Sequence, residues 1–172
     1  MRIIITGTPG TGKTKTAKAL EKYGIKNYNI KFLLEKCSEG YDKKRKTKVI
    51  DEIKLGREIS KVFKKNDDVC IESHLSHYSS PRCCDLCVVL RTKPDVLKKR
   101  LKKRGYSEKK IKENIEAEAI DLILAETVKR KFRVYEINTT GRKADDVAKE
   151  IFGALKKKKQ RHGGIKWLDG LI

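Results

Sequence analysis

One short segment, residues 7–14, constrains the fold of this chain more than any other part of its sequence. It runs Gly7-Thr8-Pro9-Gly10-Thr11-Gly12-Lys13-Thr14 and matches G-x-x-x-x-G-K-[ST], the pattern of a phosphate-binding loop. A β-branched apolar run at 2–6 precedes it, and a helical pattern from about 13 to 23 follows it. Because such a loop joins a buried strand to a helix, the segment predicts an α/β fold.

The residue types of this loop suit a nucleoside triphosphate. Its glycines let the backbone wrap so that N–H groups point at phosphate oxygens, and the next helix presents its positive N-terminus to the same anion. Lys13 supplies a cation to the β- and γ-phosphates, and the Thr14 hydroxyl is the expected ligand of Mg²⁺.

The rest of the chain continues the alternation of strand and helix. Apolar runs predict further strands at 28–30, 68–72, 86–90 and 133–137, and periodicity predicts helices at 53–63, 94–104, 107–131 and 145–155. This order is typical of a five-stranded parallel sheet with helices on both faces. Residues 31–50 and 100–115 are too polar for a core and are predicted to be mobile flaps over one sheet edge. The predicted core positions of two helices are Ile53, Ile59 and Phe63, and Ile111, Ile115, Ala119 and Leu122.

A second polar group is expected at the end of the strand at 68–72. Phosphate-loop proteins usually place a carboxylate there, which holds Mg²⁺ or its water, and Glu72 occupies this position. His74 lies two residues further, on the same side of an extended segment, where it can position water or contact the γ-phosphate. The alternative for His74 is a hydrogen-bonded loop histidine. For His77 that structural role is the favoured prediction.

Cations crowd the segment that precedes Gly105. Phosphoryl transfer needs cationic side chains that contact the transferred group. The planar guanidinium fork makes Arg100 and Arg104 better candidates for this role than the neighbouring lysines. Those lysines are expected to be solvated, whereas Arg104, beside the helix break, is expected to contact phosphate. GTPases carry N-K-x-D, which this sequence lacks. The two polar flaps fit a small-molecule kinase, with one flap for the acceptor and one as a lid.

The charge balance is the most unusual feature of the composition. The chain has 172 residues, 43 Lys and Arg against 23 Asp and Glu, and a formal net charge of +20. Such an excess favours polyanionic partners, or it reflects a solvated lysine-rich surface of the kind found in hyperthermophiles, and both can hold. The run 156–161 adds five cations beyond the last core position, Leu155. It predicts either an RNA-binding arm or a solvated helix end.

Other classes of protein are disfavoured. No run approaches 18 apolar residues, so no transmembrane helix is expected, and the N-terminus lacks the apolar core of a signal peptide. Five cysteines, an odd number, predict no disulfide framework and suggest the reducing cytoplasm. Cys84 and Cys87 form a C-x-x-C pair, so zinc is conceivable, although Cys87 falls inside a predicted strand and no second pair exists.

The motifs in their order resemble one family. The chain is similar, from Ile3 to about Glu150, to the small adenylate kinases of small-ribosomal-subunit maturation, the coilin-interacting nuclear ATPase type, with archaeal adenylate or broad-specificity nucleoside monophosphate kinases among them. After the phosphate loop the marks are Tyr28-Asn29-Ile30, Gly40-Tyr41-Asp42, Val49-Ile50-Asp51-Glu52, Glu72-Ser73-His74, Val89-Leu90-Arg91-Thr92 and the segment from Arg100 to Lys110. Glu72 stands where the family commonly has Asp, and Lys31-Phe32 where it often has Gly-Asp.

The resemblance implies a kinase domain over 1–155, with a monophosphate-binding flap at about 28–51 and a lid at about 103–113, and then a basic tail at 156–172. It implies the cofactors ATP and Mg²⁺, the reaction ATP + AMP ⇌ 2 ADP and slow ATPase activity. ATP contacts are implied at Gly10, Gly12, Lys13, Thr14, Lys15 and Arg104, and the expected catalytic set is Lys13, Glu72, His74 and Arg104, with Thr14 and Glu72 on the metal.

The sequence and the resemblance together leave two functions of different classes as alternatives. One is the nucleoside monophosphate kinase. The other is an assembly factor, an ATPase switch whose main task is to bind a platform ribosomal protein of the small subunit or rRNA, with incidental kinase turnover. The basic tail and the apolar end at 165–172 favour the second, and one molecule can carry both.

Overall fold

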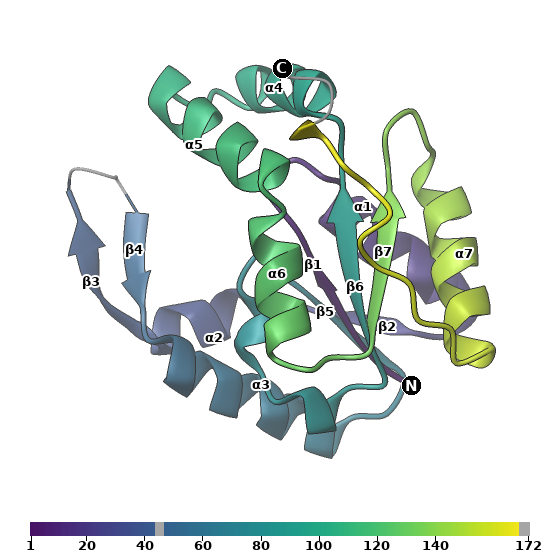
Figure 1. Cartoon of the computed structure of the whole chain (residues 1–172). Helices are drawn as coiled ribbons and strands as arrows, with labels where there is room; N and C mark the ends of the chain where they lie inside the picture. Colours follow the sequence, from purple (N-terminus) through teal and green to yellow (C-terminus); the bar gives the residue numbers. More distant parts are fainter. Residues whose placement is uncertain (44–46, 169–172) are drawn as a thin grey trace.

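The computed structural model describes residues 1–43 and 47–168, and it is built around a five-stranded sheet (Figure 1). All four neighbouring strand pairs are parallel, in the order β2-β5-β1-β6-β7. The strands are β1 (Arg2–Thr6), β2 (Lys26–Tyr28), β5 (Val69–Glu72), β6 (Leu86–Arg91) and β7 (Val134–Asn138). The predicted α/β phosphate-loop fold is confirmed. Since the strands are parallel, their carboxyl ends all meet at one edge of the sheet.

Helices cover both faces, and the alternation along β1 divides the core between them. Ile3 and Ile5 join one buried cluster, whereas Ile4 joins the other. The first cluster packs under α1 (Lys13–Leu20) and α7 (Ala144–Lys156), and the second under α2 (Lys31–Lys36), α3 (Glu52–Lys65) and α6 (Leu122–Lys129). Every residue of β6 is buried, as its continuous apolar run predicts for a strand covered on both faces.

The segment 31–50 is more regular than its polar composition predicts. It contains α2 and an antiparallel hairpin of β3 (Ser38–Asp42) and β4 (Thr47–Ile50), which projects from the body of the molecule (Figure 1). Antiparallel pairing satisfies the backbone groups even where the side chains are exposed, and this is why a polar segment forms strands here. The predicted irregular flap is therefore wrong in its local structure, and residues 44–46 of it lie outside the described residues.

The predicted strand at 28–30 is displaced. The segment that pairs with β5 is Lys26–Tyr28, and the Asn29 side chain then accepts a hydrogen bond of 2.9 Å from the backbone N–H of Lys31. This turn ends the strand and begins α2.

The predicted helix at 107–131 is in fact two helices. The first is α5 (Glu108–Ala119) and the second is α6, and they join at Asp121, whose φ of 58° is left-handed. Two of the predicted core positions are also wrong, because Ile53 is 71% exposed and Leu122 is 42% exposed. Ile59, Phe63, Ile111 and Ala119 are buried as predicted.

The C-terminal segment folds back onto the sheet. Beyond α7, the backbone of Arg161 forms a parallel bridge along β7: its N–H donates to the carbonyl of Val134 at 3.0 Å, and its carbonyl accepts from Glu136 at 2.7 Å. The Trp167 indole Nε1 donates to Glu118 at 3.2 Å. Of the run 156–161, predicted to be an RNA-binding arm or a solvated helix end, Lys156 ends α7 and Arg161 is attached to β7. Residues 169–172 lie outside the described part. In that described part, no helix is long and apolar enough to cross a membrane.

Candidate functional site

The phosphate loop connects β1 to α1 at the carboxyl edge of the sheet. Three of its glycines, Gly7, Gly10 and Gly12, have positive φ values of 134°, 95° and 99°. A Cβ on Gly7 would lie only 2.4 Å from the carbonyl oxygen of Leu90, at the end of β6. Glycine is therefore required at Gly7 both for the conformation and for this close approach.

Lys13 turns its ammonium group back into the loop. Its Nζ donates to the carbonyl oxygens of Gly7, at 2.7 Å, and Thr8, at 3.0 Å. Burial lowers the pKa of Lys13 to about 8, while the carboxylate of Glu72 opposes that shift. The group is thus still mostly protonated at pH 7, and its positive charge lies against two carbonyl oxygens of the loop.

Thr14 and Glu72, the two residues predicted to hold Mg²⁺, lie beside that cation and bond to each other. The Thr14 hydroxyl, in the first turn of α1, donates to Glu72 Oε1 at 2.9 Å, and Glu72 ends β5. A hydroxyl and a carboxylate are the hard oxygen donors that Mg²⁺ prefers. The described residues contain no cluster of three or more His, Cys, Asp or Glu able to hold a metal. This pair therefore suits an ion that takes its other ligands from phosphate and water.

A basic cleft of about 750 Å³ opens on one side of the loop; we name it the Arg104 cleft. It lies between the phosphate loop, the end of α4 (Pro94–Lys103) and the turn from β7 into α7. Its cationic lining residues are Lys15, Arg100, Lys103, Arg104, Arg142 and Lys143. A volume of this size suits a small organic ligand, and the charges suit a polyphosphate.

A second cleft, of about 500 Å³, opens on the other side of the loop, and we name it the His74 cleft. Thr8 and Pro9 of the loop form one wall, and Tyr106, Lys110 and α5 form another. Thr47, at the start of β4, also lines it, so the hairpin reaches this cleft. The two clefts take in different residues of the phosphate loop, and His74 and Arg104 line different clefts.

His74 and His77 differ in their contacts. The side chain of His74 is exposed at its cleft, yet desolvation first, and then the charges of Lys13 and His77, lower its pKa to about 4. It is therefore neutral at pH 7, as it would also be at its ordinary value. His77 is 1% exposed, and its ring nitrogens lie 3.1 Å from Thr6 Oγ1 and 2.8 Å from Glu126 Oε2. This placement fits the structural role predicted for His77.

Two arginines of the predicted lid region reach the loop. Arg104 caps the C-terminal end of α4, and its charge is close enough to lower the pKa of Lys13. Arg100 donates from Nη1 to the carbonyl of Gly10 at 3.1 Å. Lys102 instead pairs with Glu108 at 3.1 Å on the surface, as expected of a solvated lysine. Lys103, however, lines the Arg104 cleft, a position that the sequence did not distinguish from the other lysines.

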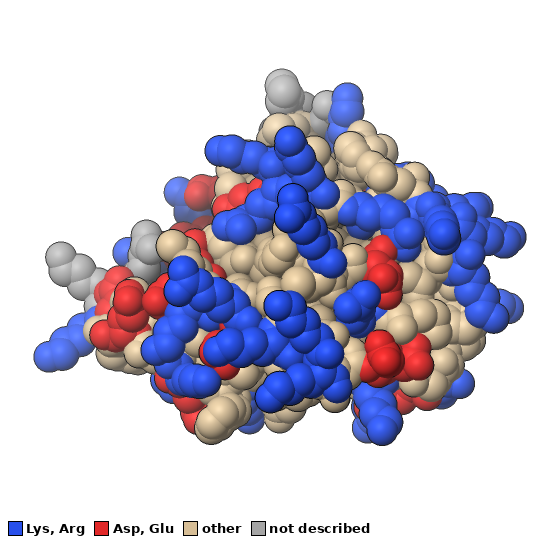
Figure 2. Space-filling view, turned by 90° about the horizontal axis from the view of Figure 1, so that it is seen from below, with Lys and Arg blue, Asp and Glu red and all other residues tan. Residues whose placement is uncertain are grey.

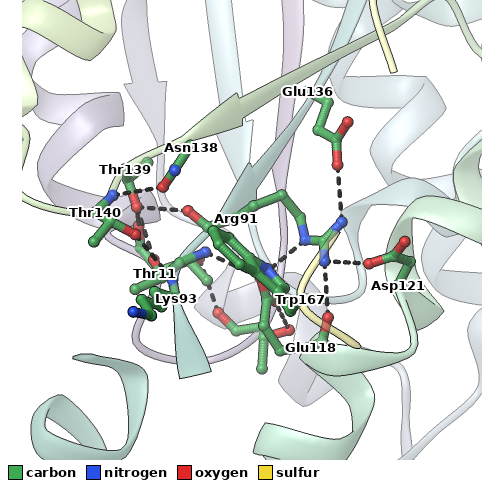
Figure 3. A network of polar contacts seen from close by, with 12 residues as sticks. Thr11, Arg91, Lys93, Glu118, Asp121, Glu136, Asn138, Thr139, Thr140 and Trp167 are labelled. Carbon is green, nitrogen blue, oxygen red and sulfur yellow. Dashed lines mark hydrogen bonds and ion pairs between the residues drawn. The ribbon is translucent and has the colours of Figure 1, made fainter. Parts of the chain in front are cut away.

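Sequence reasoning missed a buried ionic network below the loop (Figure 3). Arg91 is 2% exposed at the end of β6, and it donates to Glu118 and Glu136 at 2.8 Å each and also to Asp121. The available signal was an arginine that closes an otherwise apolar strand, since a buried charge requires partners. The sequence did not show which carboxylates these would be.

The cysteines give no support to a metal or redox site. All five are free, and Cys87 is fully buried in β6, where desolvation raises its pKa well above the ordinary value.

Two solved structures show that this architecture is shared with other proteins. *Bacillus subtilis* YorR, solved in complex with phosphorylated GDP, matches with a TM-score of 0.64 and 22% identity over 95% of this chain and 100% of that one. *Acinetobacter baumannii* shikimate kinase, solved with shikimate, matches with a TM-score of 0.62 and 15% identity over 93% and 95%. At such identities these matches establish the fold alone.

The sequence comparisons give the class and the family. A family described as "AAA domain" matches residues 3–121. Proteins with the name "Putative adenylate kinase" are 41% identical in *Methanocaldococcus jannaschii*, over 98% of this chain and 94% of the relative, and 43% identical in *Methanosarcina acetivorans*, over 99% and 100%. The chain is a phosphate-loop enzyme of the phosphotransferase class. It belongs to the family described as "AAA domain", and it is homologous to these archaeal proteins named putative adenylate kinase.

Proposed function

We propose that this chain is an ATP-dependent nucleoside monophosphate kinase that catalyses ATP + AMP ⇌ 2 ADP and hydrolyses ATP slowly. The observation that carries this proposal is the pair of separate clefts that share one phosphate loop. Direct transfer between two nucleotides requires donor and acceptor to approach the same phosphoryl group in line. A loop with a single cleft would fit a simple ATPase equally well.

The Arg104 cleft is the proposed donor site. Gly10, Gly12 and Lys15 bring the loop backbone to the ATP phosphates, and Lys13 and Arg104 supply cations to the transferred group. Arginine suits this role because its planar fork binds two oxygens at once. Thr14 and Glu72 would hold Mg²⁺, which neutralises charge on the β- and γ-phosphates.

The His74 cleft is the proposed acceptor site. The name of the archaeal relatives supports AMP as the acceptor. Lys31 and Phe32 lie in α2, in the region where the family resemblance places acceptor contacts, and Phe32 is 69% exposed. Because these two residues differ from the Gly-Asp that the family often has there, the preferred monophosphate of this chain has to be measured.

His74 is the residue we assign to the slow hydrolysis of ATP. It lies beyond Glu72, and it lines the acceptor side of the loop. Because its imidazole is neutral at pH 7, it can accept a hydrogen bond from water rather than act as a cation.

Product analysis tests the proposal directly. The chain is incubated with ATP and Mg²⁺, and with AMP, CMP, UMP, GMP or no acceptor, and nucleotides are separated by chromatography. We expect ADP formation with AMP to exceed hydrolysis by at least about tenfold, because a bound acceptor replaces water at the γ-phosphate. Release of inorganic phosphate at one rate with every acceptor would refute the kinase.

We also propose a second function, assembly of the small ribosomal subunit, with a platform ribosomal protein or rRNA as partner. The observation in its favour is a basic cleft of about 650 Å³ between α3 and the loop 78–81, whose lining includes no residue of the phosphate loop. Its cations are Arg57, Lys61, Lys64 and Arg130, against one acidic residue, Glu52. Figure 2 views the molecule from the side on which α3 lies, and Lys and Arg atoms cover much of that surface.

Matched charge reversals test this second function. The double variant Arg57→Glu with Lys64→Glu changes the basic cleft, and Lys18→Glu with Lys149→Glu makes the same change in net charge on α1 and α7. We expect only the first pair to weaken binding of a single-stranded oligoribonucleotide. It should also reduce the slope of log K against log salt by about 0.7 for each lost phosphate contact. Equal losses in both pairs would mean that net charge alone attracts RNA.

A further inference from the structure

The inference concerns Glu118, a carboxylate near the end of α5 that is 2% exposed. Its Oε2 accepts a hydrogen bond of 2.6 Å from the hydroxyl of Thr8 in the phosphate loop. Its Oε1 accepts from Arg91 Nε at 2.8 Å, from the Thr92 backbone at 2.9 Å and from Trp167 at 3.2 Å. One carboxylate thus joins the loop, the end of β6, helix α5 and the C-terminal segment, and its contacts with Arg91 and Trp167 are drawn in Figure 3.

Thr8 is the point at which this network acts on the loop. Its side chain is 2% exposed and donates to Glu118, while its carbonyl accepts from Lys13 Nζ at 3.0 Å and from the Thr11 hydroxyl at 2.9 Å. A rotation of the peptide unit after Thr8 would therefore move an oxygen that holds the catalytic ammonium. Hydrogen bonds to a charged acceptor are short and strong, and so they restrict such a rotation.

Two further contacts hold the part of the loop that lines the Arg104 cleft. Arg100 donates to the carbonyl of Gly10 at 3.1 Å, and the Thr139 hydroxyl lies 2.9 Å from the carbonyl of Thr11. Thr8 lies on the wall of the His74 cleft, where neither of these groups acts. Of the contacts named here, Glu118 therefore provides the charged anchor on the acceptor side.

We propose that Glu118 is a positioning residue for phosphoryl transfer, which fixes the phosphate loop through Thr8 and connects the loop to the lid through α5. Glu118 itself touches no reacting group. It acts by keeping the Lys13 ammonium and the loop N–H groups directed at the transferred phosphoryl group. A displacement of about 1 Å in such groups can lower a rate by about 10²-fold, so an anchor at this point matters more for turnover than for nucleotide affinity.

The chain offers a matched control in Glu136. This carboxylate is 1% exposed and also accepts from Arg91 at 2.8 Å, but the side-chain bonds it forms, with Arg91 and with the Gly164 backbone, do not involve the loop. Glu136→Gln thus damages the same ionic network without touching Thr8. Thr8→Val removes the hydroxyl from the loop and leaves the bond between Glu118 and Arg91, and Thr8→Ser restores a hydroxyl.

The test measures kcat, KM and stability in the full chain with ATP and AMP. We expect Glu118→Gln and Thr8→Val to lower kcat by about tenfold or more while KM for ATP changes by less than about threefold. Thr8→Ser should recover most of kcat, and the double variant should lose no more than the worse single variant. Glu136→Gln should lower the melting temperature but keep kcat.

Equal kcat losses in Glu118→Gln and Glu136→Gln, or additive losses in the double variant of Glu118 and Thr8, would overturn the proposal. If Glu118→Gln does not fold, Thr8→Val and Thr8→Ser still decide it.

This proposal rests on the kinase function, so a measurement without turnover separates the two. Amide hydrogen exchange is followed across residues 7–14 in the chain without nucleotide. We expect faster exchange there in Thr8→Val and Glu118→Gln than in Glu136→Gln, and unchanged exchange would overturn the positioning role. If no monophosphate is phosphorylated but this exchange pattern is found, the kinase is refuted and the anchor stands.

Discussion

The phosphate loop (residues 7–14) and the C-terminal segment (residues 157–168) are both short, and both form a hydrogen bond to the carboxylate of Glu118. Thr8 of the loop and Trp167 of the segment donate to the two oxygens of Glu118. Some of the contacts that hold the loop are local, because Lys13 bonds carbonyls only six and five residues away. Arg100, Thr139 and Glu72 also bond the loop from distant elements. The bond of Trp167 is to a residue 49 positions away. The comparison shows that the loop has local contacts of its own in addition to distant ones, whereas the segment depends on the surface against which it packs.

The largest effect on kcat should come from Lys13→Ala, which tests the role of the phosphate loop. Loss of one preorganised charged donor at a reacting phosphate costs about 10²- to 10³-fold in kcat. Initial rates of ADP formation measure it, with circular dichroism and a melting curve as evidence of folding. Turnover within a few-fold of the parent chain, in a folded variant, would contradict the assignment of the loop.

The pH dependence of the same residue gives the next effect. Burial lowers the pKa of Lys13 to about 8, so the free enzyme loses this cation as the pH rises through that value. We expect kcat/KM for ATP to fall above about pH 8, and to approach a tenfold loss per pH unit, because this ratio reports ionisations of the free enzyme. A pH profile that stays flat to pH 10 would show that the protonated form is not required.

Arg104→Ala should lower kcat by about tenfold, since a guanidinium fork at the donor phosphates is lost. Lys103 lines the same cleft and provides the matched control. Lys103→Ala removes a point charge and should cost less than about threefold. Steady-state kinetics compares the two, and equal small losses would mean that the contact of Arg104 with phosphate is misassigned.

His74→Ala should reduce ATP hydrolysis by several-fold and leave ATP affinity nearly unchanged, because His74 lies on the acceptor side of the loop. Phosphate release without AMP measures the first quantity, and titration with a fluorescent ATP analogue measures the second. A loss confined to affinity would place His74 on the donor side instead.

The smallest effect on turnover belongs to the C-terminal segment. Trp167→Phe keeps an aromatic ring but removes the N–H that donates to Glu118, and should lower the free energy of unfolding by about 1 kcal/mol. Catalysis should persist, since Thr8 and Arg91 still bond the carboxylate. Chemical denaturation and kcat are measured together. A kcat loss as large as that of Thr8→Val would remove the distinction between loop and segment.

Deletion from Lys156 onward extends that comparison to binding. The deletion removes five cations from the run 156–161, but also the bridge of Arg161 to β7 and the contact of Trp167. We expect weaker RNA association and a lower melting temperature, with the kinase activity retained. Full contact of all five cations would change the salt slope by about 3.5–4.5, and the attachment of Arg161 to the sheet predicts less. An unchanged slope would remove the binding role of the run.

The sequence determined the features that depend on neighbouring residues. The glycine pattern at 7–14 set the loop and required a strand before it and a helix after it. The apolar runs placed four of the five strands closely, and the end of one strand located Glu72 beside Thr14. These features follow from backbone conformation, side-chain alternation and the common edge of parallel strands, all of which a short window of sequence contains.

Only the tertiary structure decided which distant groups meet. Arg91 takes carboxylates 27, 30 and 45 residues away, and the one at Asp121 lies at the left-handed junction that divides the predicted long helix into α5 and α6. The pattern of charges likewise did not predict that Arg161 pairs along β7. A buried arginine requires carboxylate partners, and an edge strand such as β7 can pair with another segment. The sequence contains several carboxylates and several segments that could fill these roles. Packing selects among them, because it alone brings particular partners within hydrogen-bonding distance.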